Sequence, residues 1–102
     1  MEAEEFFSSK LRIKIIKLFL QLGELNVSEV ARRLSINYRT INKHLKILKE
    51  EGILQHKIFG RIHLYRINEK SPKTKVLQKL VEVWEHSNKE LDNFYRRSKK
   101  KT

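Results

Sequence analysis

The chain has no cysteine, one proline and three glycines among its 102 residues. Without cysteine it can form no disulfide framework, thiolate metal site or cysteine nucleophile, and it suits a reducing compartment. Uninterrupted apolar runs are only a few residues long, and residues 1–5 lack the basic start of a signal peptide. We therefore expect a cytoplasmic protein without membrane contact.

Acidic residues are also few: 12 stand against 23 lysines and arginines, which gives a formal net charge of +11. Such an excess favours a polyanionic partner, and nucleic acid is the first candidate. The apolar fraction of 39% is sufficient for one small core in a chain of this length. We expect a single compact unit.

A first helix is predicted over residues 8–22, with Gly23 as its C-terminal cap. Ser28 is expected to cap a second helix that runs to about Leu34, after an extended link over residues 25–27. The helical spacing in the first helix predicts a buried face made of Leu11, Ile15, Leu18, Phe19 and Leu22.

A third helix is predicted to begin after Asn37, a good N-cap, and to end at Gly52. Its apolar stripe consists of Ile41, Leu45 and Leu48. The period then changes to two, and residues 53–59 and 61–67 are rich in β-branched and aromatic residues on either side of Gly60. This pattern predicts a β-hairpin.

The last predicted helix covers residues 73–97 and opens at Ser71 and Pro72, a capping serine followed by a proline in the first turn. Residues 98–102 form a basic tail that we expect to be disordered. The element order predicts a mainly α fold with a small β-hairpin wing. It is that of a winged helix-turn-helix domain over residues 1–72, with the long C-terminal helix in the same compact unit.

The third helix leaves a polar face in its first turns, where a recognition helix enters the major groove of DNA. Arginine and lysine can donate to guanine, asparagine can pair with adenine, and threonine offers a methyl group to thymine. In the wing, a cation after Gly60 can reach the minor groove or a phosphate. The predicted DNA-binding residues are Tyr38, Arg39, Thr40, Asn42, Lys43, Lys46, Lys57 and Arg61.

The charge distribution supports the assignment of these residues to DNA binding, because residues 39–66 hold seven basic and only two acidic side chains. A solvated helix face and a basic hairpin tip that serves solubility are the plain alternatives. DNA is preferred to RNA because the narrow major groove of A-form RNA excludes a helix.

The segment from Leu11 to Ile67 resembles the ArsR-type winged helix-turn-helix repressors. The resemblance rests on residues 26–34 (NVSEVARRL), 40–48 (TINKHLKIL), 52–54 (GIL), the pair 60–61 (GR) and residues 65–67 (YRI). MarR-type regulators share much of this pattern. The resemblance implies a homodimer that binds a pseudo-palindromic operator of double-stranded DNA, with helix 38–51 in the major groove and wing 53–67 on the minor groove or backbone.

The sequence departs from the family in two places. The best-known members sense metals through cysteine pairs in the helix before the recognition helix, and residues 26–34 have none. This excludes a thiolate-bound metal. A glycine is common in the helix-turn-helix turn, where this chain has Ser35, so the turn geometry is expected to differ slightly.

The last helix carries a heptad-like apolar seam with spacings of 3 and 4, interrupted only by Ser87. Its length exceeds what one winged helix needs, which favours pairing with a second copy, although folding back onto its own domain is the alternative. Phe6 and Phe7 either join this interface or form a local hydrophobic staple. The predicted dimer interface comprises Phe6, Phe7, Leu77, Leu80, Trp84, Leu91 and Phe94.

Three competing functions remain. Glu82, His86 and Glu90 share a helix face and could bind zinc between two copies, but a charged face with i,i+4 pairs is the simpler interpretation. An enzyme is not expected, since the chain has no nucleophile elbow, phosphate-binding glycine loop or metal triad, and no cofactor is predicted. A winged helix that binds only protein is the remaining alternative.

The remaining histidines point to no catalytic site. His44 is expected to bond structurally across the domain. His56 and His63 are expected to be neighbours across the hairpin, where two ligands alone are weak evidence for a metal.

Overall fold

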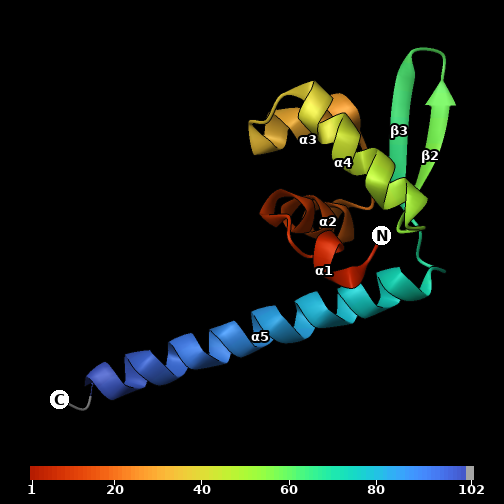
Figure 1. Ribbon diagram of the computed structural model, residues 1–102. Coiled ribbons are helices and arrows are strands. Elements are labelled where there is room, and N and C mark those ends of the chain that lie inside the picture. The colour runs from red at the N-terminus through yellow and green to blue at the C-terminus, as the bar shows by residue number, and fades with distance from the viewer. Residues whose placement is uncertain (101–102) are drawn as a thin grey trace.

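The computed structural model describes residues 1–100, with side chains described to residue 97. Figure 1 shows two helical layers beside an upright hairpin, with one long helix passing beneath them. The predicted fold class, a mainly helical winged helix-turn-helix with a long C-terminal helix, is confirmed. The elements are α1 (Ala3–Phe6), α2 (Lys10–Leu22), β1 (Glu24–Asn26), α3 (Val27–Leu34), α4 (Tyr38–Glu50), β2 (Leu54–Phe59), β3 (Ile62–Ile67) and α5 (Pro72–Lys100).

Helix α3 begins two residues earlier than predicted, because Asn26 and not Ser28 is its N-cap. The Oδ1 atom of Asn26 accepts from the backbone N–H of Glu29 at 2.8 Å, and Glu29 Oε1 accepts in return from the Asn26 N–H at 3.4 Å. This reciprocal capping box satisfies two N–H groups that a helix start leaves free. Ser28 lies exposed in the first turn.

The turn between α3 and α4 uses a left-handed residue at Ser35, with φ 55° and ψ 41°. Serine thus takes the conformation that glycine adopts without strain. Asn37 caps α4 as predicted, and its Oδ1 accepts from the Thr40 N–H at 2.8 Å. The turn is therefore tight enough to bring the two helices into contact.

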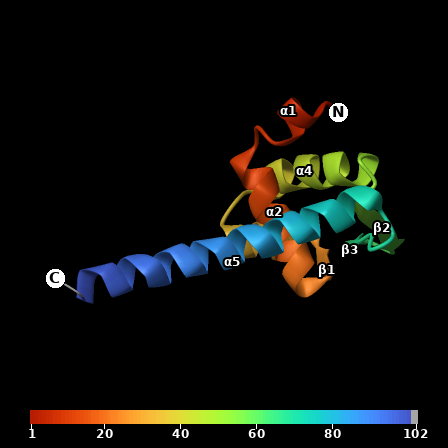
Figure 2. The same ribbon diagram turned by 90° about the horizontal axis from the view of Figure 1, so that it is seen from below.

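The wing belongs to a three-stranded antiparallel sheet in the order β1-β3-β2. The predicted hairpin is present, with Leu54 opposite Ile67 and Phe59 opposite Ile62. The extended link proves to be strand β1, which pairs with the base of β3 and is labelled in Figure 2. Pairing to β1 anchors the base of the wing and leaves its tip projecting.

The core lies between the helices and the inner face of the sheet. Ile15 and Phe19 of the predicted face of α2 are fully buried, but Leu22 is 42% exposed and Ile16 is 2% exposed. The buried face of α2 is therefore rotated toward Ile16, and the prediction for Leu22 was wrong. Other residues with under 2% exposure include Val27, Val30, Ile41, Leu45, Leu48, Ile53, Tyr65 and Thr74.

Helix α5 buries side chains against the body in its first turns. Thr74 and Leu77 are buried, and the Thr74 hydroxyl donates to the Ile53 carbonyl at 3.4 Å. An ion pair between Lys17 of α2 and Glu85 holds the middle of the helix. Beyond that point α5 leaves the body, as Figures 1 and 2 both show.

The C-terminal end of α5 differs from the expectation of a disordered tail over residues 98–102. The helix continues to Lys100, and residues 101–102 lie outside the described part of the chain. Among the residues described, no helix is both long and apolar enough to cross a membrane.

Candidate nucleic-acid interface

Helix α4 separates its apolar and polar residues onto opposite faces. Ile41, Leu45 and Leu48 are completely buried and fix the helix to the core. The predicted contact residues Tyr38, Arg39, Lys43 and Lys46 are exposed, whereas Thr40 and Asn42 are half-buried at the margin of this face. The predicted contact residues therefore place one aromatic and three cationic side chains on the exposed part of α4, and Lys49 and Glu50 are exposed in its last turn.

The wing tip lies beside the start of α4. Tyr38, Arg61 and His63 line a shallow cleft of about 130 Å³ together with Ile62 and the first turn of α3. Arg61 occupies the hairpin turn next to Gly60, whose φ is 59°, and both Arg61 and Lys57 are exposed. The structure thus joins the two predicted contact segments in one surface, which the sequence separates by about twenty residues.

Sequence reasoning missed an apolar component of this surface. Ile58, Phe59 and Ile62 are 59%, 61% and 56% exposed at the end of the hairpin. In sequence they were indistinguishable from strand residues that pack on a core, because their period-two pattern is the same. Only the pairing of the hairpin places them at the tip.

The two wing histidines are in contact, as expected. His56 Nε2 lies 3.1 Å from His63 Nδ1, and the His56 ring stacks on Tyr65 with centroids 4.4 Å apart. Burial, and then the nearby charge of Lys49, hold the pKa of His56 below its ordinary value. The two imidazoles therefore bridge β2 and β3 on the face of the sheet that packs toward the core.

His44, on the partly buried side of α4, does not make the predicted bond across the domain through its Nδ1. That atom is buried and has no hydrogen-bond partner among the described residues. Burial, followed by the positive charge of Arg12, holds the pKa of His44 below its ordinary value. Arg12 is itself buried and donates to the carbonyl of Phe6 at 2.7 Å.

The predicted dimer interface divides into two groups. Phe6 and Leu77 are 7% and 5% exposed and belong to the core of the same chain. The remaining residues form an exposed apolar stripe on α5 together with one side chain before α2. These are Phe7, Leu80, Trp84, Leu91 and Phe94, with exposed fractions of 45% to 65%.

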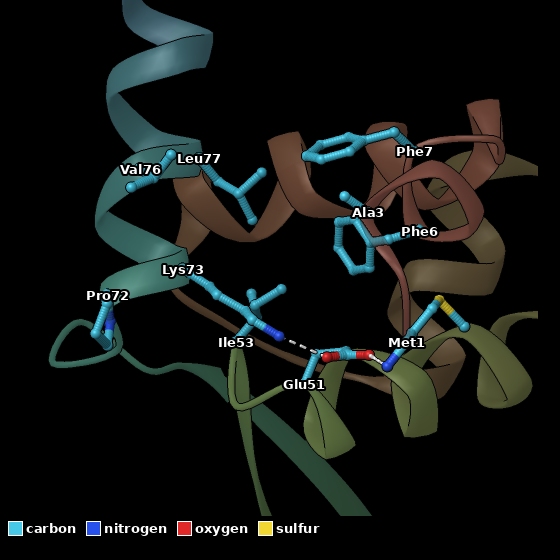
Figure 3. A pocket seen from close by; sticks show the side chains of 10 residues that line it. All are labelled: Met1, Ala3, Phe6, Phe7, Glu51, Ile53, Pro72, Lys73, Val76 and Leu77. Carbon is cyan, nitrogen blue, oxygen red and sulfur yellow. Dashed lines mark hydrogen bonds and ion pairs between the residues drawn. The ribbon is translucent and has the colours of Figure 1, made fainter.

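An apolar pocket of about 340 Å³ opens between α1 and the first turns of α5 (Figure 3). Phe7 and Val76 border it, and Phe6 and Leu77 form its inner wall. At one end Glu51 accepts from Lys73 Nζ at 2.7 Å and lies 2.8 Å from the N-terminal amine. The hydrogen bond from Lys73, and then that from the amine, lower the pKa of Glu51 to about 2.

The residues considered for zinc lie on the exposed part of α5. His86 Nε2 is 3.0 Å from Glu90 Oε1, an i,i+4 pair in which both side chains are exposed. Within the described residues, no three histidine, cysteine or acidic side chains gather as a metal site would require.

Comparison with known proteins identifies the helix-turn-helix. The sequence profile of bacterial regulatory proteins of the arsR family matches residues 9–56. No curated protein sequence gives a significant match.

Several solved structures share the fold. The antimony-specific transcriptional repressor AntR superposes with a TM-score of 0.71 at 17% identity, over 85% of this chain and 77% of that one. HlyU from Vibrio cholerae gives 0.67 at 21% identity, over 79% and 85%. The homodimeric winged helix-turn-helix domain of a possible ArsR-family regulator from Mycobacterium bovis gives 0.65 at 26% identity, over 81% and 74%.

Proposed function

We propose that this chain, an ArsR-type winged helix-turn-helix transcriptional regulator, binds double-stranded DNA with sequence specificity as a homodimer. The observation that carries the proposal is the exposed cationic face of α4 over a completely buried apolar face. A helix held in this way can enter a major groove without losing its contacts to the core.

In this proposal the first turns of α4 read the bases. Arg39 and Asn42 are the side chains suited to guanine and adenine, while Tyr38, Lys43 and Lys46 contact phosphates or base edges. Thr40 lies at the margin and is suited to a thymine methyl group. Sequence discrimination therefore concentrates in the first two turns of the helix.

The wing makes the second contact. Because Arg61 and Tyr38 border the same cleft, a duplex that receives α4 also passes the wing tip. Arg61 is placed for the minor groove or its phosphates, and Lys57 for the backbone alone. The wing thereby adds affinity on the side of the recognition helix.

The exposed stripe on α5 supports the homodimer. An exposed apolar stripe of this kind on a small protein marks an interaction site, and a two-fold interface buries the same stripe of both copies. Two copies then present two recognition helices to a pseudo-palindromic operator. A protein bound there blocks access of other proteins to the same DNA, which favours repression.

A protein-interaction module without DNA specificity is the alternative, and the exposed apolar residues of the wing and α5 favour it. Selection of bound duplexes from a random pool decides between the two. We expect an inverted repeat with half-sites about one helical turn apart. Recovery of no enriched sequence would favour the interaction module.

Fluorescence anisotropy against salt concentration tests the charged surface separately. If a dimer neutralises about 8 to 10 phosphates, log affinity should fall with log salt at a slope of roughly −7 to −9. A slope near zero would contradict the assignment of α4 and the wing to DNA.

A further inference from the structure

The wing tip carries an apolar surface that the proposed phosphate and base contacts do not use. We define the apolar wing tip as Ile58, Phe59 and Ile62, each more than half exposed. Exposed clusters of large apolar side chains are unusual in soluble proteins and mark surfaces that bind something.

The strand register places these side chains on both faces of the hairpin end. Phe59 is directly opposite Ile62, so the two share the outer face of the sheet. Ile58 is opposite His63 and continues the inner face that carries the histidine pair. The end of the hairpin therefore carries apolar side chains on both faces of the sheet, and these side chains add to the thickness of the two strands.

The charge around the tip indicates a polyanion as its occupant. Residues 52–68 contain no aspartate or glutamate but include Lys57, Arg61 and Arg66. Arg61 lies in the turn between Phe59 and Ile62, and the tip shares a cleft with Tyr38 of α4. The partner of the tip is therefore the same polyanion that α4 faces.

We propose that the apolar wing tip enters the minor groove of the bound duplex, where Phe59 wedges into a base step and bends the DNA. This inference rests on the proposed DNA-binding function and adds to it a residue that recognises DNA deformability. Neither Phe59 nor its apolar neighbours can form the hydrogen bonds of direct base readout.

The width of the hairpin tip compared with that of the minor groove favours a tip that opens the groove over one that fits into it unchanged. The minor groove of B-DNA is about 6 Å wide, and two paired strands are already about 4.8 Å apart before side chains are added. The tip can enter only if the groove opens. Apolar side chains that partly unstack a base step open it and bend the duplex toward the major groove, and flexible steps such as TA bend at the lowest cost.

The experiment compares Phe59→Ala, Phe59→Leu and the wild-type chain on the duplex recovered by random selection. Leu22→Ala is the matched control, because Leu22 is an exposed apolar residue far from the wing tip in the sequence. Bending is measured by energy transfer between dyes at the two ends of the duplex, and affinity by anisotropy at several salt concentrations.

We expect the wild-type chain to bend the duplex by at least about 20°. Phe59→Ala should remove most of the bend and weaken binding about 10- to 100-fold without changing the salt slope. Phe59→Leu should retain most of both effects, since leucine also serves as a wedge. Leu22→Ala should change neither quantity.

Three results would overturn the proposal. The first is normal binding and bending by Phe59→Ala, and the second is a loss of affinity with the bend unchanged. The third is a change in sedimentation of Phe59→Ala alone, which would make the tip an interface between copies. Failure of the wild-type chain to select any duplex would instead refute the proposed function, and this inference with it.

Discussion

Truncation of Trp84 tests the proposed dimer most directly. Trp84 is the only tryptophan of the chain, lies on the part of α5 beyond the last core contact at Leu77, and is 65% exposed. We expect Trp84→Ala to dissociate the dimer while leaving the winged helix folded.

The size of the effect follows from this exposed fraction. A tryptophan side chain buries up to about 250 Å², so about 160 Å² of Trp84 is free for a partner. At about 25 cal/mol per Å² this surface contributes about 4 kcal/mol per copy. If half of the total for two copies is realised, the dimer loses about 4 kcal/mol, or roughly a thousandfold in Kd.

Sedimentation equilibrium measures this Kd, and tryptophan fluorescence gives an independent signal. As the wild-type chain is concentrated, its emission should shift to the blue because the indole of Trp84 leaves water. Gln78→Ala, an exposed polar residue of the same helix, is the control and should leave Kd unchanged. A wild-type chain that stays monomeric at high micromolar concentration, or an emission maximum independent of concentration, would refute the reasoning.

Three further predictions concern binding, capping and pH. Arg39→Ala should reduce the binding free energy for the selected duplex by about 1 to 3 kcal/mol and relax base specificity, as measured by anisotropy. Lys57→Ala should weaken binding to all duplexes alike in the same assay. Equal losses of affinity from Arg39→Ala on selected and random DNA would show that Arg39 contacts phosphate. Asn26→Ala should lower the free energy of unfolding in urea by about 1 kcal/mol and Ser28→Ala should not, because only Asn26 is the cap. Equal effects of the two substitutions on stability would contradict the capping box. The pKa of Glu51 is lowered to about 2, so its contribution to stability is complete above the ordinary carboxyl value of 4.5 and is lost as pH falls toward 2. The difference in Tm between Glu51→Gln and the wild-type chain should therefore shrink across that window, and a difference that is constant with pH would refute the ion pair.

Local chemistry allowed much of the fold to be predicted. The helix starting after Asn37, the hairpin around Gly60 and the proline-initiated last helix each have a strong signal in a few neighbouring residues. The cap of α3 was misassigned because Asn26 and Ser28 are both good caps. Asn26 is the cap because it is the last residue of strand β1 and the helix starts directly after it. The pairing of β1 with β3 sets where that strand ends.

The sequence by itself determined that α4 carries its cations on one face and its apolar residues on the other, because helical periodicity depends only on spacing. Tertiary structure alone decided which apolar residues stay outside. Phe6 and Leu77 are covered by the body of the chain, whereas Trp84 and Phe59 project past it, although all four are similarly hydrophobic. Burial depends on what another segment places opposite a residue, and that information is distributed over the whole chain.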